Sequence, residues 1–196
     1  CLLINLEYGV NILPSIPISE LMLNLIYHEK NPFIRSMEYD EYRIAGNSTY
    51  KKAKAYNKGV QFPQYCNPNT FRFEIKTGQA KFIKRLGLLS LKDLTDAGNY
   101  NALIISLLKE WDNILLFDKS KKVDVKFLNT HFWEETILAI NRNKFCLQKK
   151  QYYRKLGTDN LHTNIKKLIE RKTQLLKSVQ IPTTINLETA QYRVLL

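Results

Sequence analysis

The stretch that decides the fold lies at residues 70–76 and reads Thr-Phe-Arg-Phe-Glu-Ile-Lys. Its apolar and charged residues alternate strictly, which is the period of a β-strand with one buried face. We expect the apolar members to point into a core, and the charged members Arg72, Glu74 and Lys76 to share the opposite face. The sequence therefore predicts a sheet that is apolar on one side and charged on the other.

Two segments that precede this stretch show the same alternation. In residues 2–12 the even-numbered positions are apolar or aromatic, so Glu7 falls on the polar face. In residues 49–58 two alanines mark the inner face, and the outer face carries Lys52, Lys54, Tyr56 and Lys58. If the three strands belong to one sheet, its polar face gathers two carboxylates, one tyrosine and several cations.

The remaining segments are mostly helical in pattern. After residue 79 the apolar period lengthens to about 3.6, the period of a helix. Helices are expected at residues 19–31, 82–86, 99–117, 123–140 and 160–177. Ser90 and Asp93 match a capping box. Trp111 and Trp133 are expected to anchor the core, and His28 to be a partly exposed helical residue. The predicted fold class is α+β: an antiparallel sheet with packed helices over residues 1–120, then a helical C-terminal extension over residues 121–196.

Composition and charge narrow the classes of function. The chain has 196 residues and is 44% apolar, so it can bury a core, and no apolar run approaches the roughly 18 residues of a membrane span. Thirty basic against eighteen acidic residues give a net charge of +12. The charge rises from −3 over residues 1–50 to +7 over residues 51–100. Such a field attracts polyanions such as nucleic acid, although a solvated lysine-rich surface would show the same composition.

Cysteine and histidine usage excludes several metal and disulfide classes. The three cysteines, Cys1, Cys66 and Cys146, are far apart and form no CxxC pair, which argues against a zinc ribbon or a disulfide scaffold. A cytoplasmic protein without a membrane partner is therefore expected. Because the chain begins with Cys and opens on an apolar run, we also expect a fragment that lacks its natural N-terminus.

The polar face predicted above has the residue types of phosphodiester chemistry. Carboxylates such as Glu7 and Glu74 bind Mg²⁺ or Mn²⁺, a tyrosine hydroxyl such as that of Tyr56 attacks phosphorus, and cations hold flanking phosphates. The alternative is a solvated sheet face with routine Glu–Lys pairs. On the helix at residues 160–177, the basic residues Lys166, Lys167, Arg171 and Lys172 share a polar side. They would follow a DNA backbone, or they simply form a solvated helix face.

Five short motifs occur in an order that resembles a known family. They read Leu-Glu-Tyr-Gly-Val-Asn-Ile at residues 6–12, Ala-Tyr-Asn-Lys-Gly-Val-Gln at 55–61, Phe-Arg-Phe-Glu-Ile-Lys at 71–76, Lys-Arg-Leu-Gly at 84–87 and Leu-Lys-Asp-Leu at 91–94. This order resembles the replication initiators of small plasmids and filamentous phages, the gene II/X type, and their relatives in Bacteroidetes elements. The resemblance covers residues 2–120. The chain departs from the family in having no His-hydrophobe-His pair, and in Asn57, where Asp is more common.

The resemblance implies nicking of one strand at an origin, a covalent tyrosine–phosphate link and rejoining after rolling-circle replication, with a divalent metal. Carried over to this chain, it implies Glu74 and Glu7 as ligands of Mg²⁺ or Mn²⁺, and Tyr56 and Lys58 as catalytic residues. It further implies origin DNA, single-stranded or cruciform, as the partner. Lys52, Lys54, Arg72, Lys76, Lys166, Lys167 and Arg171 are the cations expected to bind that DNA.

Two alternative functions remain open at this point. A non-catalytic DNA-binding module of a mobile element would form no covalent adduct with DNA. A basic structural or interaction protein would show no salt-sensitive retention of DNA. The sequence alone leaves open the origin sequence, the oligomeric state and whether the chain is an enzyme.

Overall fold

The computed structural model describes residues 2–35, 42–47, 50–141 and 143–177. Its largest element is an antiparallel sheet of five strands in the order β1-β7-β6-β5-β4. These strands are β1 (Leu6–Ile12), β4 (Ile34–Arg35), β5 (Tyr42–Asn47), β6 (Lys51–Asn57) and β7 (Phe71–Thr77). The expected α+β class with an antiparallel sheet and C-terminal helices is confirmed.

The helices vary from one turn to seventeen residues. They are α1 (Ile18–Asn24), α2 (Lys58–Gln61), α3 (Ala80–Arg85), α4 (Ala97–Asp112), α5 (Thr130–Leu138), α6 (Lys144–Leu156) and α7 (Leu161–Lys177), with 3₁₀ turns at Leu91–Thr95 and Val125–Leu128. The capping box at Ser90 and Asp93 is present as predicted, and it begins the first 3₁₀ turn. The helix expected at residues 123–140 is divided in two at Asn129, whose side chain caps α5.

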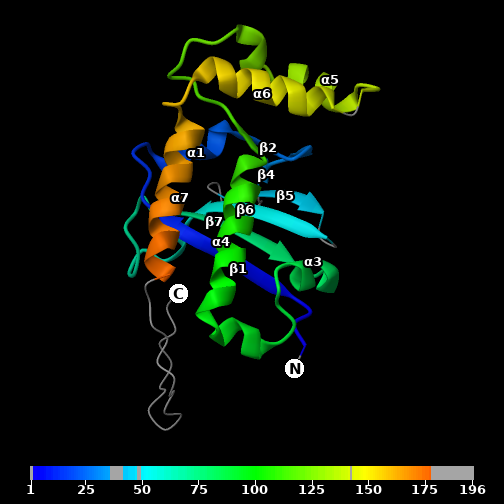
Figure 1. Ribbon diagram of the computed structural model, residues 1–196. Coiled ribbons are helices and arrows are strands. Elements are labelled where there is room, and N and C mark those ends of the chain that lie inside the picture. The colour runs from blue at the N-terminus through cyan, green and yellow to red at the C-terminus, as the bar shows by residue number, and fades with distance from the viewer. Residues whose placement is uncertain (1, 36–41, 48–49, 142, 178–196) are drawn as a thin grey trace.

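One face of the sheet forms the main core. Phe71, Phe73 and Ile75 are fully buried there, and the rings of Phe71 and Phe73 meet Trp111 of α4 edge-on. Figure 1 shows α4 and α7 side by side across this face of the sheet. Since Ile165 and Ile169 of α7 belong to the same core cluster, the last helix of the expected 121–196 extension packs with the sheet domain.

A second, smaller sheet differs from the sequence-based prediction. It has the order β3-β2-β8 and consists of β2 (Leu25–His28), β3 (Asn31–Pro32) and β8 (Ile114–Leu116). The predicted helix at residues 19–31 therefore ends at Asn24, and the one at 99–117 ends at Asp112. The two errors have one cause, because β2 and β8 pair with each other across some ninety residues and this pairing overrides local helical periodicity.

The small sheet carries the second core. Tyr27 and Leu115 pack there with Phe127, Trp133 and Tyr152 from the C-terminal helical segment. Figure 1 places α5 and α6 beyond the β2 end of the molecule, away from α3 and the N-terminal end of the chain. Both predicted tryptophan anchors are confirmed, since Trp111 and Trp133 are fully buried in separate cores.

Candidate nucleic-acid interface

The charged face predicted from strand alternation exists, and we call it the open face. In the middle of it, Glu74 of β7 pairs with Lys54 of β6 on one side and with Gly9 of β1 on the other. The helices α1, α4 and α7 contribute to the core cluster on the opposite face. The open-face side chains are Glu7, Asn11, Tyr42, Ile44, Lys52, Lys54, Tyr56, Arg72, Glu74 and Lys76.

Five of these residues form a bonded group, the open-face cluster: Glu7, Lys54, Tyr56, Arg72 and Glu74. The Glu74 carboxylate accepts hydrogen bonds from Arg72 Nε, from Lys54 Nζ at 3.0 Å and from the Tyr56 hydroxyl at 3.1 Å. Lys54 Nζ also lies 3.0 Å from Glu7 Oε2. Both predicted carboxylates therefore meet at one cation, and that cation is the Lys54 ammonium group.

Gly9 makes room for this arrangement. A Cβ atom on Gly9 would lie 2.4 Å from Glu74 Cβ and 2.5 Å from the Phe73 carbonyl oxygen. Atoms at those distances overlap, so any larger residue in this position would push β1 away from β7 or displace Glu74. The glycine in the Tyr-Gly-Val segment of β1 thus has a specific packing role beside the carboxylate.

Glu74 stays ionised although it is buried. Burial by itself would raise the pKa of Glu74, but hydrogen bonds with Glu7, Arg72 and Lys54 outweigh it and lower the pKa to about 2. For Lys54, burial acts to lower the pKa, and the bonds to Glu7 and Glu74 raise it above its ordinary value. For Arg72, burial also acts to lower the pKa, and the hydrogen bond to Glu74 raises it above its ordinary value. Glu74, Lys54 and Arg72 therefore form a fixed group of one carboxylate and two cations, all of them charged at neutral pH.

Tyr56 is held by its neighbours on this face. Its side chain is 7% exposed, its ring stacks on Tyr42 at a centroid distance of 4.9 Å, and its hydroxyl donates to Glu74. Burial, followed by the negative charge of Glu74, raises the pKa of the Tyr56 phenol far above its ordinary value. The phenol is therefore protonated at neutral pH, and it uses its proton to bind the carboxylate.

Lys58 lies just past the end of β6, as the first residue of α2. Its ammonium group lies 3.9 Å from the centroid of the Phe62 ring and 5.7 Å from that of Tyr56. Burial, and then the positive charge of Arg72, lowers the pKa of Lys58. The pair Tyr56 and Lys58 predicted from sequence is thus brought close together at the margin of the open face.

A divalent metal does not fit the cluster as it stands. The described residues contain no group of three or more His, Cys, Asp or Glu side chains that would hold a metal ion. Between Glu7 and Glu74, the place of a bridging cation is taken by Lys54 Nζ, which binds both carboxylates. Mg²⁺ and Mn²⁺ prefer several oxygen ligands, and here two carboxylates already have cationic partners.

The seven cations predicted to bind DNA divide into two groups. Lys52, Lys54, Arg72 and Lys76 all lie on the open face. The remaining three lie on α7, where Lys167 and Arg171 are exposed, while Lys166 binds the Asp112 carboxylate at 2.7 Å. The two groups are therefore separate, because α7 packs against the core side of the sheet.

A second charged group was missed in the sequence and lies on the core side of the sheet. This interior cluster consists of His28, Glu29, Lys51 and Glu110: Lys51 Nζ binds Glu110 at 2.8 Å and Glu29 at 2.9 Å, and His28 Nε2 lies 2.9 Å from Glu110. His28 is 1% exposed and belongs to β2, so its prediction as a partly exposed helical residue is wrong. One signal was present, since Lys51 has the same parity as the inward-facing Ala53 and Ala55.

Among the residues that the structure describes, no helix has the length and apolarity to cross a bilayer. Comparison of the chain with protein-family models, with curated proteins and with solved structures finds no match. The evidence on function therefore lies in the open face itself.

Proposed function

We propose that this protein is a DNA-binding replication initiator that holds origin DNA on the open face of its five-stranded sheet. The observation that carries the proposal is the charge of this face. Among the described residues of this face and its margin there are five cations, against the two carboxylates Glu7 and Glu74: Lys52, Lys54, Lys58, Arg72 and Lys76. The helices of the main core lie on the other side, and cations such as Arg72 and Lys76 keep exposed surface that phosphates can reach.

The internal ion pairs favour this use of the face. Glu74 holds Arg72 and Lys54 in fixed positions, and the side chains of these two residues keep 19% and 13% of their surface exposed. A cation that is already ordered loses little side-chain entropy when it binds a phosphate. Beside these two residues, Lys76 is 44% exposed and adds a more accessible positive charge. The proposal includes a cytoplasmic location, where single-stranded or cruciform origin DNA would be met.

The test is the salt dependence of DNA binding, measured by fluorescence anisotropy with a labelled oligonucleotide. Replacing Lys52 and Lys76 together by Ala should weaken binding and reduce the slope of log K against log salt by about 1–2. The matched control replaces Lys144 and Lys150, two exposed lysines of α6, which lies beyond the small sheet. Equal effects of the two double variants would mean that the open face is not the binding surface. Absence of salt-sensitive binding would favour the basic interaction protein.

Tyrosine-dependent nicking is a second candidate, favoured by the contact of Tyr56 with Glu74 and by the position of Lys58 beside Tyr56. In this reaction the Tyr56 oxygen bonds to phosphorus and the phenolic proton passes to Glu74. The bond from phosphorus to the leaving sugar oxygen breaks, and Lys58 donates a proton to that oxygen. The burial and raised pKa of Tyr56 oppose this reaction, so DNA must first expose the phenol.

Covalent adducts distinguish the two candidates. After incubation with origin DNA and Mn²⁺, the nicking candidate predicts a protein–DNA adduct that survives denaturation in a gel. The Tyr56→Phe variant should form none while it still binds DNA. If the unaltered protein binds DNA with salt dependence and forms no adduct, the non-catalytic function is the correct one.

A further inference from the structure

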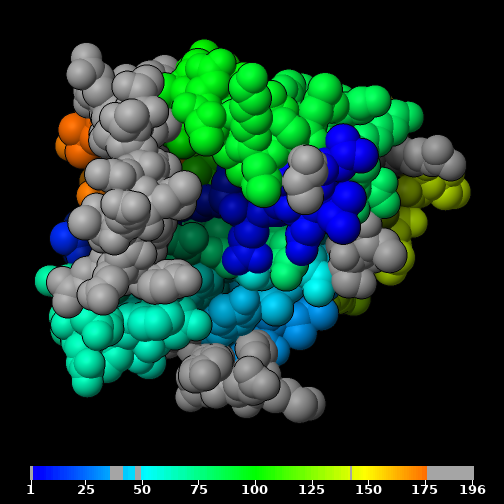
Figure 2. Space-filling model, turned by 90° about the horizontal axis from the view of Figure 1, so that it is seen from below, coloured from blue at the N-terminus to red at the C-terminus, as the bar shows by residue number. Residues whose placement is uncertain are grey.

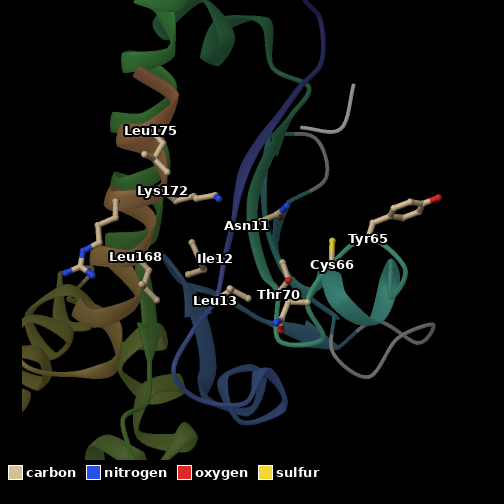
Figure 3. A pocket seen from close by; sticks show the side chains of 11 residues that line it. Asn11, Ile12, Leu13, Tyr65, Cys66, Thr70, Leu168, Lys172 and Leu175 are labelled. Carbon is tan, nitrogen blue, oxygen red and sulfur yellow. The ribbon is translucent and has the colours of Figure 1, made fainter. Parts of the chain in front are cut away.

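A cavity of about 610 Å³ lies between the end of β1, the loop after α2 and the last turns of α7. Figure 3 shows how these three segments surround it, with Leu13 and Thr70 on one side and Leu168 and Lys172 of α7 on the other. A volume of this size falls within the range of about 300–1,000 Å³ that is usual for small-ligand sites. It is therefore large enough for a nucleotide.

The lining of the cavity combines apolar walls with positive charge. Ile12, Leu13, Leu168 and Leu175 provide apolar surface, whereas Arg171 and Lys172 provide two cations. The lining includes no Asp or Glu, and no carboxylate among the described residues is bonded to either cation. Lys172 extends from α7 toward β1 in Figure 3. The chemistry that complements this lining is an apolar ring joined to an anion.

Exposed apolar side chains are concentrated at the same place. Leu13 is 56% exposed, Leu175 60% and Tyr65 71%. Apolar surface left in water around one concave site is typical of a binding site. Tyr65 points away from the cavity into the open (Figure 3), which is a suitable position for an aromatic ring on which an adjacent base stacks.

The cavity adjoins the open face. Asn11, which lines the cavity, accepts a hydrogen bond from Arg72 Nη1 at 3.2 Å, and Arg72 belongs to the open-face cluster. Figure 2 shows dark-blue N-terminal residues between green residues near position 100 and cyan residues near position 50. A DNA strand whose phosphates follow the open face would therefore reach the cavity without crossing the core.

We propose that this cavity takes up one unstacked nucleotide of a bound DNA strand. Its base enters the apolar space beside Leu13 and Leu168, and its phosphate lies near Arg171 and Lys172. The inference rests on the proposed DNA binding and adds that the substrate is locally single-stranded, because a base inside a duplex cannot enter a cavity. It also gives Arg171, on the core side of the sheet, a role in the same DNA path as Arg72.

The test compares two labelled single strands of equal charge: an oligothymidylate of about 12 nucleotides and an abasic deoxyribose-phosphate chain of the same length. The unaltered protein should bind the thymidylate about tenfold more tightly, the gain expected from burying or stacking one base. Leu13→Trp, which fills the cavity from an exposed position, should reduce this ratio to about one. The control Leu23→Trp, at an exposed position of α1 outside the cavity, should keep the ratio.

A second pair of variants guards against loss of folding. Lys172→Ala, inside the cavity, should reduce affinity for both strands more than Lys167→Ala, one exposed lysine of the same helix outside it. Thermal melting monitors the fold of each variant. Equal binding of both strands by the unaltered protein, with salt dependence intact, overturns the cavity proposal and leaves the open-face proposal standing. Failure to bind either strand overturns both.

Discussion

Glu74 and Glu110 are both buried carboxylates that bind a lysine of β6, yet they lie on opposite faces of the sheet. Glu74 binds Lys54 on the open face, and Glu110 binds Lys51 on the core face. Burial by itself would raise the pKa of both carboxylates. Hydrogen bonds lower it to about 2 in each case, those from Glu7, Arg72 and Lys54 at Glu74 and those from His28 and Lys51 at Glu110. Local chemistry is thus nearly the same at the two sites.

The two clusters differ in what surrounds them. Glu110 is enclosed by His28 of β2 and by Lys51, whose side chain is only 8% exposed. The cations around Glu74 keep more of their surface in water and have further lysines beside them. A buried pair such as Lys51 and Glu110 offers almost no charged surface to a ligand and stabilises the fold, whereas cations that keep exposed surface can also bind an anion. Position in the fold, and not residue type, therefore separates the structural cluster from the candidate site.

The largest effect is expected from removing the interior carboxylate. Glu110→Ala leaves the buried Lys51 without its main partner, and we expect a loss of about 3–5 kcal/mol in the free energy of unfolding. Urea denaturation measures it. Glu29→Ala removes the 46% exposed partner of the same lysine and should cost about 1 kcal/mol or less. Equal costs would show that the interior cluster is not closed to water.

Acid should weaken both clusters together. The folded pKa of Glu74 and Glu110 lies near 2, below the ordinary glutamate value of 4.5. Each carboxylate therefore contributes stability above pH 4.5 that is lost as the pH falls toward 2. The loss should be on the order of 3 kcal/mol for each carboxylate at most. Unfolding measured from pH 6 to pH 2 should show a flatter profile for Glu74→Gln and for Glu110→Gln. If both variants kept the pH profile of the unaltered protein, the lowered pKa values of Glu74 and Glu110 would be contradicted.

A smaller effect should distinguish the open face by its packing. Gly9→Ala forces a Cβ atom against Glu74 Cβ and the Phe73 carbonyl oxygen, and should cost about 1–3 kcal/mol while it weakens DNA binding. Gly78→Ala is the matched control, since nothing lies within 4 Å of its added Cβ. That control should change stability by less than about 1 kcal/mol. If Gly9→Ala left both stability and DNA binding unchanged, neither would depend on the close packing of Gly9 against Glu74.

The smallest effect on stability is expected at Lys76. Its Nζ atom lies 3.7 Å from Glu7 Oε2, and its side chain is 44% exposed. Because exposed ion pairs contribute little, Lys76→Ala should change the free energy of unfolding by less than about 1 kcal/mol. In the same variant, the slope of log K against log salt for DNA binding should become shallower by about 1. A large loss of stability, or an unchanged salt slope, would remove the contrast between the binding face and the interior cluster.

Much of the open face was predictable because it depends on local alternation. Side chains on a strand point to opposite sides in turn, so the parity of Arg72, Glu74 and Lys54 placed them together as soon as the strands belonged to one sheet. The interior cluster was not predictable in the same way. It joins β2, β6 and α4, and no local pattern indicates that His28 and Glu110, 82 residues apart, will meet.

The amino-acid sequence by itself determined the α+β class, the two faces of the large sheet, the burial of Trp111 and Trp133, and the excess of positive charge. Only the tertiary structure decided that Leu25–His28 and Ile114–Leu116 are strands, that Lys54 lies between the two carboxylates, and that α7 closes a cavity beside β1. Periodicity and charge are properties of neighbouring residues. Strand pairing, ion pairing and cavities arise between segments far apart in the chain, where packing outweighs local preference.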